Sequence, residues 1–483
     1  MKKILLITTV FCFTVISLYS QNDIDAFRFS QVNWQGTARF MGAGGAFGAV
    51  GAEYSALNVN PATIGIYKRN EISFTPIMIS IFNSQSDYSG DNNRYLASNY
   101  SLPNFGMIGV ISTSSGKWKG VQLGFGYNRI NDFNNAFRIE GRNNGSSMAD
   151  IFVRNANGTH YENLIADQYL AWNTFVIDTL PNTTNQYYSP FSNADLLQKK
   201  YTRTSGAINE MNFSIGGNYD DKLYIGATIG VPFLNYREES EYSETDDENL
   251  IGGVRSFFMH DNLRVRGTGV NLKLGLIYQP VEYFRFGVAF HTPTYYGNLK
   301  HTRVRDMIAY FDDGSSTAQN NPHQYENYNT YKLVTPLRAV GSVAFLIQKR
   351  AFVSLDYEFS HYGMASLYGR NYSYTEENRN IQDKYGPSHT IRVGSEVFLS
   401  NQFLFRLGYN FMSNPYSRNV DNNSSAHLVS AGVGLRTNNF FLDLAYNIQL
   451  SKERYWMYDP AYVSPADNHY TTHRIAATLG FKF

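Results

Sequence analysis

The chain has 483 residues, with 41 Lys and Arg against 40 Asp and Glu, one Cys, 16% aromatic residues and a mean hydropathy of -0.35. A net charge near zero argues against nucleic-acid binding, which depends on a basic surface, and the aromatic content argues against disorder. A single Cys excludes a disulfide framework.

The start of the chain predicts an export signal. Two Lys precede an apolar run over 4–18, and small residues stand just before Gln21. The run is short for a membrane-spanning helix, which needs about 20 apolar residues. We therefore interpret residues 1–20 as a secretory signal peptide, which would take the lone Cys12 with it.

The next segment, residues 21–69, does not alternate between apolar and polar positions, and its centre is rich in Gly and Ala. It is not a dinucleotide-binding loop, because Phe47 stands where the pattern G-x-G-x-x-G needs its last Gly and no strand precedes the run. Small residues allow close packing in a narrow space. We expect a compact segment here.

The rest of the chain shows strict alternation, which is typical of strands with one apolar and one polar face. Met211 to Tyr219 is an example, with Asn, Ser and Gly between its apolar residues. Fourteen such segments are expected, near residues 70–82, 102–113, 118–129, 207–219, 222–236, 262–280, 282–298, 331–348, 350–363, 387–399, 402–412, 426–437, 439–450 and 470–483.

The connections also alternate in length. Short ones such as Asp220-Asp221 are followed by long ones, of which 130–206 is the largest. Outer-membrane barrels have short turns on the periplasmic side and long loops outside. The last strand ends on Phe483, which resembles the recognition signal of bacterial outer-membrane barrels, although an ordinary final strand would also fit.

The polar faces of the predicted strands carry charges that would point into a barrel lumen. We expect these charges to pair across strands and to hold the segment 21–69, although a polar ligand path is the alternative. They are Glu210, Lys273, Asp356, Glu358, Arg392, Glu396, Arg406 and Asp443.

The Gly-rich segment resembles the hatch of the FadL/TodX family of outer-membrane transporters for long-chain fatty acids and other hydrophobic compounds. The match rests on a G-x-x-R start, a Gly/Ala-rich middle and an Asn-Pro-Ala triplet. The residues are Gly36, Arg39, Gly42, Gly44, Asn60, Pro61 and Ala62. The resemblance implies an all-β fold, a 14-stranded antiparallel transmembrane β-barrel over 70–483 whose lumen is plugged by an N-terminal hatch over 21–69.

The resemblance also implies a function, namely passive uptake of a hydrophobic small molecule or fatty acid across the outer membrane of a Gram-negative bacterium. The ligand would bind in the lumen and leave sideways into outer-membrane lipid, with the hatch residues named above as the gate. We expect a monomer. The alternative is a non-transport barrel that acts as a scaffold subunit of a secretion or surface-assembly complex.

The long loop 130–206 supplies candidates for ligand capture. Its apolar residues recur at near-helical spacing, so they could form short helices around a capture groove, or they could pack on one another as a lid. The candidates are Ile151, Phe152, Leu164, Ile165, Tyr169, Trp172 and Phe175.

Catalysis has little support in the sequence. The ten His are scattered singly, and neither H-E-x-x-H nor G-x-S-x-G occurs. We expect no enzyme activity, no cofactor, no metal site and no nucleic-acid partner, and the acidic run Asp246-Asp247-Glu248 is interpreted as solvated or cation-binding surface.

Overall fold

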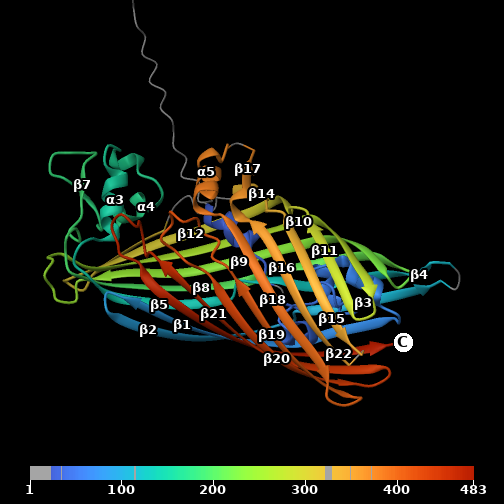
Figure 1. The fold of residues 1–483 in the computed structure, drawn as a ribbon. Helices are drawn as coiled ribbons and strands as arrows, with labels where there is room; N and C mark the ends of the chain where they lie inside the picture. Colours follow the sequence, from blue (N-terminus) through green and yellow to red (C-terminus); the bar gives the residue numbers. More distant parts are fainter. Residues whose placement is uncertain (1–22, 34, 114–115, 321–328, 349, 371) are drawn as a thin grey trace, which may run out of the picture.

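The wall of the molecule is a closed antiparallel barrel of 14 strands, as the alternation predicts. The computed structural model describes residues 23–33, 35–113, 116–320, 329–348, 350–370 and 372–483, so the expected signal peptide over 1–20 lies outside the described residues. The barrel closes because β1 (Glu71–Tyr88) pairs with β22 (Ala466–Lys482). Figure 1 shows the hatch helices inside the barrel.

Hydrogen bonding joins 20 strand segments into one sheet, because four wall strands are each interrupted once and two loop strands, β13 (Ser316–Asn320) and β17 (Ser366–Gly369), pair with the sheet as well. Uninterrupted strands are β8 (Leu196–Tyr219), β9 (Leu223–Thr245), β10 (Val254–Val281), β16 (Ala351–His361), β18 (Pro387–Phe398), β19 (Phe403–Met412), β20 (Ala426–Arg436) and β21 (Phe440–Tyr455). Interrupted strands are β2 (Asp91–Ser101) with β3 (Asn104–Ser112), β4 (Trp118–Asp132) with β5 (Asn135–Asn143), β11 (Phe284–His291) with β12 (Tyr295–Phe311), and β14 (Asn329–Val334) with β15 (Arg338–Ile347).

Proline accounts for three of the interruptions. Pro103, Pro293 and Pro336 separate the two halves of their strands, as expected for a residue that cannot donate to the hydrogen-bond ladder. The fourth interruption, between β4 and β5, falls on Phe133 and Asn134.

The remaining elements lie in the lumen or on the loops. The hatch contains α1 (Asp23–Ser30), α2 (Ala38–Gly42), η1 (Tyr54–Asn58) and η2 (Pro61–Ile66). Loops contain α3 (Met148–Ala156), η3 (Tyr161–Asn163), α4 (Ala166–Asn173), β6 (Asp178–Thr179), β7 (Tyr187–Tyr188), β13 (Ser316–Asn320), η4 (Tyr362–Met364), β17 (Ser366–Gly369) and α5 (Thr375–Lys384). None of the described helices has the length and apolar character needed to cross a membrane.

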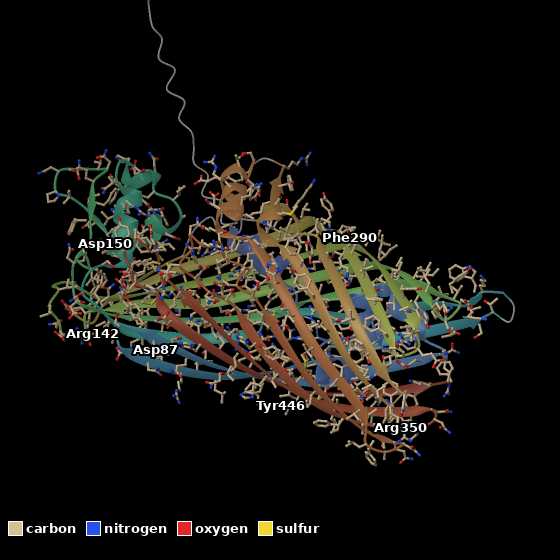
Figure 2. All side chains as sticks on the ribbon, viewed as in Figure 1. Asp87, Arg142, Asp150, Phe290, Arg350 and Tyr446 are labelled. Atoms are coloured by element: carbon tan, nitrogen blue, oxygen red, sulfur yellow. The ribbon has the colours of Figure 1, made fainter. Side chains whose placement is uncertain are left out.

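The outer surface of the barrel carries an apolar belt. On β10 the outward residues from Val270 to Tyr278 are exposed and apolar, whereas Asn271 and Lys273 between them are buried. This pattern is that of a barrel whose outer face contacts lipid. We call the end with short connections the turn end and the other the loop end; Arg350 lies at the former and Asp87 at the latter (Figure 2).

The strands extend well past this belt at the loop end. β5 and the first part of β8 lie inside the predicted loop 130–206, so only residues 144–195 of that loop lie outside the wall strands. The prediction missed these extensions because both faces of a strand outside the membrane can be polar, which removes the alternation on which it depended.

The hatch and the wall approach each other backbone to backbone. Gly44 has a φ of +63°, and a Cβ placed there would lie 3.0 Å from the backbone nitrogen of Tyr409. Opposite it, a Cβ on Gly408 of β19 would lie 2.1 Å from the backbone nitrogen of Gly44. Glycines on both surfaces therefore let the plug fit the lumen.

This contact makes a testable prediction. Gly408→Ala forces two backbones apart, so we expect about 1–3 kcal/mol of destabilisation and increased protease cleavage within the hatch. The control is Gly341→Ala on β15, where a Cβ would meet nothing within 4 Å. Equal stability of the two variants in urea unfolding would contradict the close fit.

Candidate functional site

The hatch is hydrogen-bonded to wall strands on all sides of the lumen. Ala38 donates to Thr478 of β22 over 2.7 Å, and Gly48 donates to Asp356 of β16 over 3.0 Å. The backbone carbonyl of Val59 contacts the His291 ring of β11 at 3.0 Å. Contacts in so many directions fix the plug in place.

Buried ion pairs support the same arrangement. Arg39 of the hatch donates two hydrogen bonds to Glu396, at 2.8 and 2.9 Å, and Glu396 also accepts from Arg406 at 2.6 Å. Arg406 continues to Asp443 at 2.7 Å. One chain of charges thus joins the hatch to β18, β19 and β21.

The other predicted lumen charges also pair. Lys273 of β10 contacts Glu210 of β8 and donates to the hatch residue Asn58 over 3.0 Å. Glu358 of β16 accepts from Arg338 at 2.8 Å and from Arg392 at 2.5 Å. The expected pairing across strands is therefore confirmed for seven of the eight charges, and Asp356 holds the hatch through the Gly48 amide instead.

The Asn-Pro-Ala triplet is buried against β9 and β10. The Asn60 side chain accepts from the Ala62 amide at 3.1 Å and donates to the carbonyls of Gly48 and Leu276 at 2.7 and 3.3 Å. It thereby caps η2, with Pro61 as the first residue of that helix. These hydrogen bonds hold the triplet in place at the start of η2. Its role in gating stays a prediction.

The other predicted gate residues lie in the same plug. A Cβ on Gly36 would collide with Ser55 within the hatch, and a Cβ on Gly42 would lie 3.1 Å from Gly432 of β20. They let the chain pack, and nothing in the structure assigns them a ligand.

Hydrogen bonding between neighbouring wall strands stops beside β2. β3 pairs with β4 as far as Asn104 and Asn128, but among the described residues β2 forms a ladder only with β1. β5 instead bends to the lumen side, where Ser84 of β1 donates to the Ala136 carbonyl over 2.8 Å. This leaves β2 with a free edge.

The free edge begins inside the apolar belt and is approached by the hatch. Ile79 and Tyr100, both exposed, pair in register on β1 and β2 just beyond the point where the ladder ends. Where β4 loses its partner, the hatch amide of Asn33 donates to Ile130 over 2.9 Å. The hatch therefore occupies part of the break from the inside.

A cavity of about 560 Å³ lies beside this break. Its walls come from the hatch, the β4–β5 bend and the strands around the loop end, and they mix aromatic rings with charged groups. Lining residues include Phe27, Phe82, Phe133, Tyr236, Tyr416, Asp25, Arg28, Glu238, Glu453 and Arg474. The sequence did not predict these lining residues. Its signals of an interrupted strand were Pro103 and the stretch 131–135, which is polar except for Phe133.

The segment 144–195 at the loop end, which we call the insert, contains helices α3 and α4, as the apolar spacing suggested. Phe152 of α3 and Leu164 are buried in a hydrophobic cluster together with residues from β8 to β12, and Tyr169 and Trp172 of α4 pack against it. Ile165 and Phe175 are each 51% exposed, and Ile151 is half-buried. Most candidates thus pack on one another, as the lid interpretation proposed, and only two present apolar surface to solvent.

A buried carboxylate docks this insert onto the barrel. Glu244, near the end of β9 and far beyond the belt residue Phe233, accepts from the Met148 amide at 2.8 Å and from Tyr242 and Gln198 at 2.5 and 3.0 Å. Burial raises the pKa of Glu244 to about 7, although these hydrogen bonds act in the opposite direction. Among the described residues, no group of His, Cys, Asp and Glu could hold a metal ion.

Solved structures share this fold. They include the P. putida toluene transporter TodX (12% identity, 93% of this chain, 99% of that chain, TM-score 0.53), the Ralstonia pickettii toluene transporter TbuX (14%, 93%, 99%, 0.51) and a Pseudomonas aeruginosa FadL homologue (13%, 94%, 98%, 0.51). No family model and no curated protein matches the sequence. The chain therefore has the FadL/TodX type of barrel, as the hatch resemblance implied.

The Lys273–Glu210 pair provides a test of the plug. Lys273→Met leaves the fully buried Glu210 carboxylate without its cation, so we expect a loss of about 3–5 kcal/mol and a hatch that proteases reach. Adding Glu210→Gln should recover much of the loss. The control is Arg138→Met in the exposed Arg138–Glu140 pair, where less than about 1 kcal/mol is expected.

The docking of the insert should depend on pH. The pKa of Glu244 is raised from 4.5 to about 7 in the folded state. Docking of the insert is therefore most stable below pH 4.5 and loses stability as the pH rises towards 7, by about 1.4 kcal/mol for each pH unit between these two values. Amide hydrogen exchange of α3, corrected for intrinsic rates, measures this. Glu244→Gln should abolish the dependence and the exposed Glu239→Gln should retain it; an unchanged profile in Glu244→Gln would contradict the assignment.

Proposed function

We propose that the protein is a bacterial outer-membrane channel for the passive uptake of hydrophobic small molecules. The observation that carries the proposal is the cavity of about 560 Å³, which touches both the hatch and the interrupted wall. A water-filled pore has no need of either feature, whereas a solute that partitions into lipid needs a binding space and a sideways exit. Transfer into lipid is downhill for an apolar solute.

The exit we propose is the break between β2 and β5. Backbone groups on a free strand edge at membrane depth are unfavourable in lipid unless protein or water covers them. The hatch residues Asn33 and Gln35, which donate to Ile130 and Arg129 of β4, supply part of that cover. Movement of this hatch segment would then open the cavity towards the bilayer.

Two observations support a hydrophobic ligand. Phe82, Phe133 and Phe137 line the cavity on the side of the break, and apolar contacts there suit an aromatic or alkyl ligand. Solved structures with this fold include two named as toluene transporters. We therefore propose toluene and long-chain fatty acids as the first ligands to test.

Pinning the free edge tests the exit. The Asn93 side-chain amide donates to the Glu140 backbone carbonyl over 3.0 Å across the break, so Asn93→Cys with Glu140→Cys should form a disulfide that joins β2 to β5. We expect uptake of labelled toluene or oleate by cells to fall at least fivefold on oxidation and to recover with reductant.

The control disulfide is Asp87→Cys with Asn92→Cys. These residues are directly opposed in the β1–β2 hairpin, at the same end of the barrel, and their linkage does not cross the break. Uptake through the Asn93–Glu140 disulfide at the wild-type rate would rule out this exit. Absence of uptake of either compound by wild-type protein, relative to cells without it, would rule out the function.

A further inference from the structure

A second gap between wall strands, which we call the seam, lies at the loop end of β20. β20 pairs with β21 as far as Ala426 and Ser451, whereas β21 continues to Tyr455 with β22 as its partner. One edge of β21 from Lys452 to Tyr455 therefore faces the loop 413–425 and has no strand beside it.

A single side chain closes this seam. Asn422 accepts from the Arg454 amide at 2.9 Å and donates to the Arg454 carbonyl at 3.1 Å, so its amide group imitates one step of a strand ladder. The exposed Arg454–Asp421 ion pair also crosses the seam. Such a closure is much weaker than the ladder below it, because a ladder adds a pair of hydrogen bonds at every second residue pair.

Cavities lie on both sides of the seam. The central cavity of about 560 Å³ lies on the lumen side, and a pocket of about 380 Å³ at the outer surface is lined by 420–423, 452–454 and 467–469. Lys452 and Glu453 line both spaces, so only this stretch of β21 and the Asn422 loop separate the lumen from the outside here.

The outer pocket is polar. Its lining carries Asp421, Lys452, Arg454, Asp467 and His469. Asn468, which also lines the pocket, is 1% exposed and lies 3.0 Å from the Tyr470 hydroxyl through its side-chain amide. The pocket thus offers a solute both charged and hydrogen-bonding groups.

Apolar packing occupies part of the route along the barrel axis at the loop end. Tyr242, Phe257, Met307 and Met457 belong to one buried cluster that joins the strands at the loop end to α3 and α4. A polar-headed solute that approached the cavity from above would meet this cluster, whereas the seam offers charged and hydrogen-bonding groups along its whole length.

We propose that the seam is a side gate: Asn422 parts from Arg454, and amphipathic molecules with a charged or hydrogen-bonding head group pass from the outer pocket into the central cavity. The gate rests on the proposed uptake function and names the ligand class for it. Its polar lining discriminates against bare hydrocarbons, which gain nothing from these groups.

A cross-link across the seam tests the gate. The lone Cys12 lies outside the described residues, so introduced thiols are the only ones in the barrel. Asn422→Cys with Arg454→Cys, joined by a short bismaleimide, should lower oleate uptake at least fivefold. Asp87→Cys with Asn92→Cys, joined by the same reagent across the β1–β2 hairpin and away from both cavities, should leave uptake within twofold of wild type.

A second readout does not depend on transport. Gln449 of β21 lines the central cavity and is absent from the outer pocket, so Gln449→Cys reports on access to the lumen. For this readout the Asn422→Cys and Arg454→Cys thiols are joined by oxidation to a disulfide, which leaves the single thiol at position 449 free. We expect a membrane-impermeant charged maleimide, added outside, to react at least fivefold more slowly when the seam is linked.

The outcomes separate the two proposals. Unchanged oleate uptake and unchanged Gln449→Cys labelling in the seam-linked protein would overturn the gate, as would equal effects of the two cross-links. Absence of both oleate and toluene uptake by wild-type protein would overturn the uptake function, while slower labelling on cross-linking would still support the gate.

Discussion

The constraint on which this structure depends is that backbone hydrogen-bonding groups at membrane depth need partners. It explains why β1 pairs with β22 to close the sheet, and why an interruption of the ladder is accompanied by another source of partners. At the break beside β2, the hatch donates to β4; at the seam above β20, the Asn422 side chain replaces a strand. Irregularity in the wall is therefore found where protein covers it.

The second theme is the treatment of charge in the lumen. Arg39, Glu396 and Arg406 form one buried chain, and removing any member would leave a buried charge, which costs far more than an intact pair contributes. These pairs position the hatch more than they stabilise it. The glycines that face each other across the same interface have the complementary role, because they allow the backbones to come close enough for the pairs to form.

Much of the fold was predictable from the sequence and much of the site was not. Strands in the belt alternate strictly because one face meets lipid, so residues such as Met211 and Phe213 revealed them, and Arg39 with Asn60 revealed the hatch by resemblance. The extensions of β5 and β8 meet water and lose that signal. The cavity and both wall irregularities depend on pairing register, which single strands do not encode; Asn422 looks like an ordinary loop residue until Arg454 lies beside it.

The hatch also constrains how the protein can be assembled. Its residues contact β10, β11, β16, β20 and β22, so the wall surrounds it completely once β1 and β22 are joined. The hatch can make this full set of contacts only when all five strands stand around it. Completion of the hatch and completion of the wall are therefore coupled, since each supplies hydrogen-bond partners that the other buries.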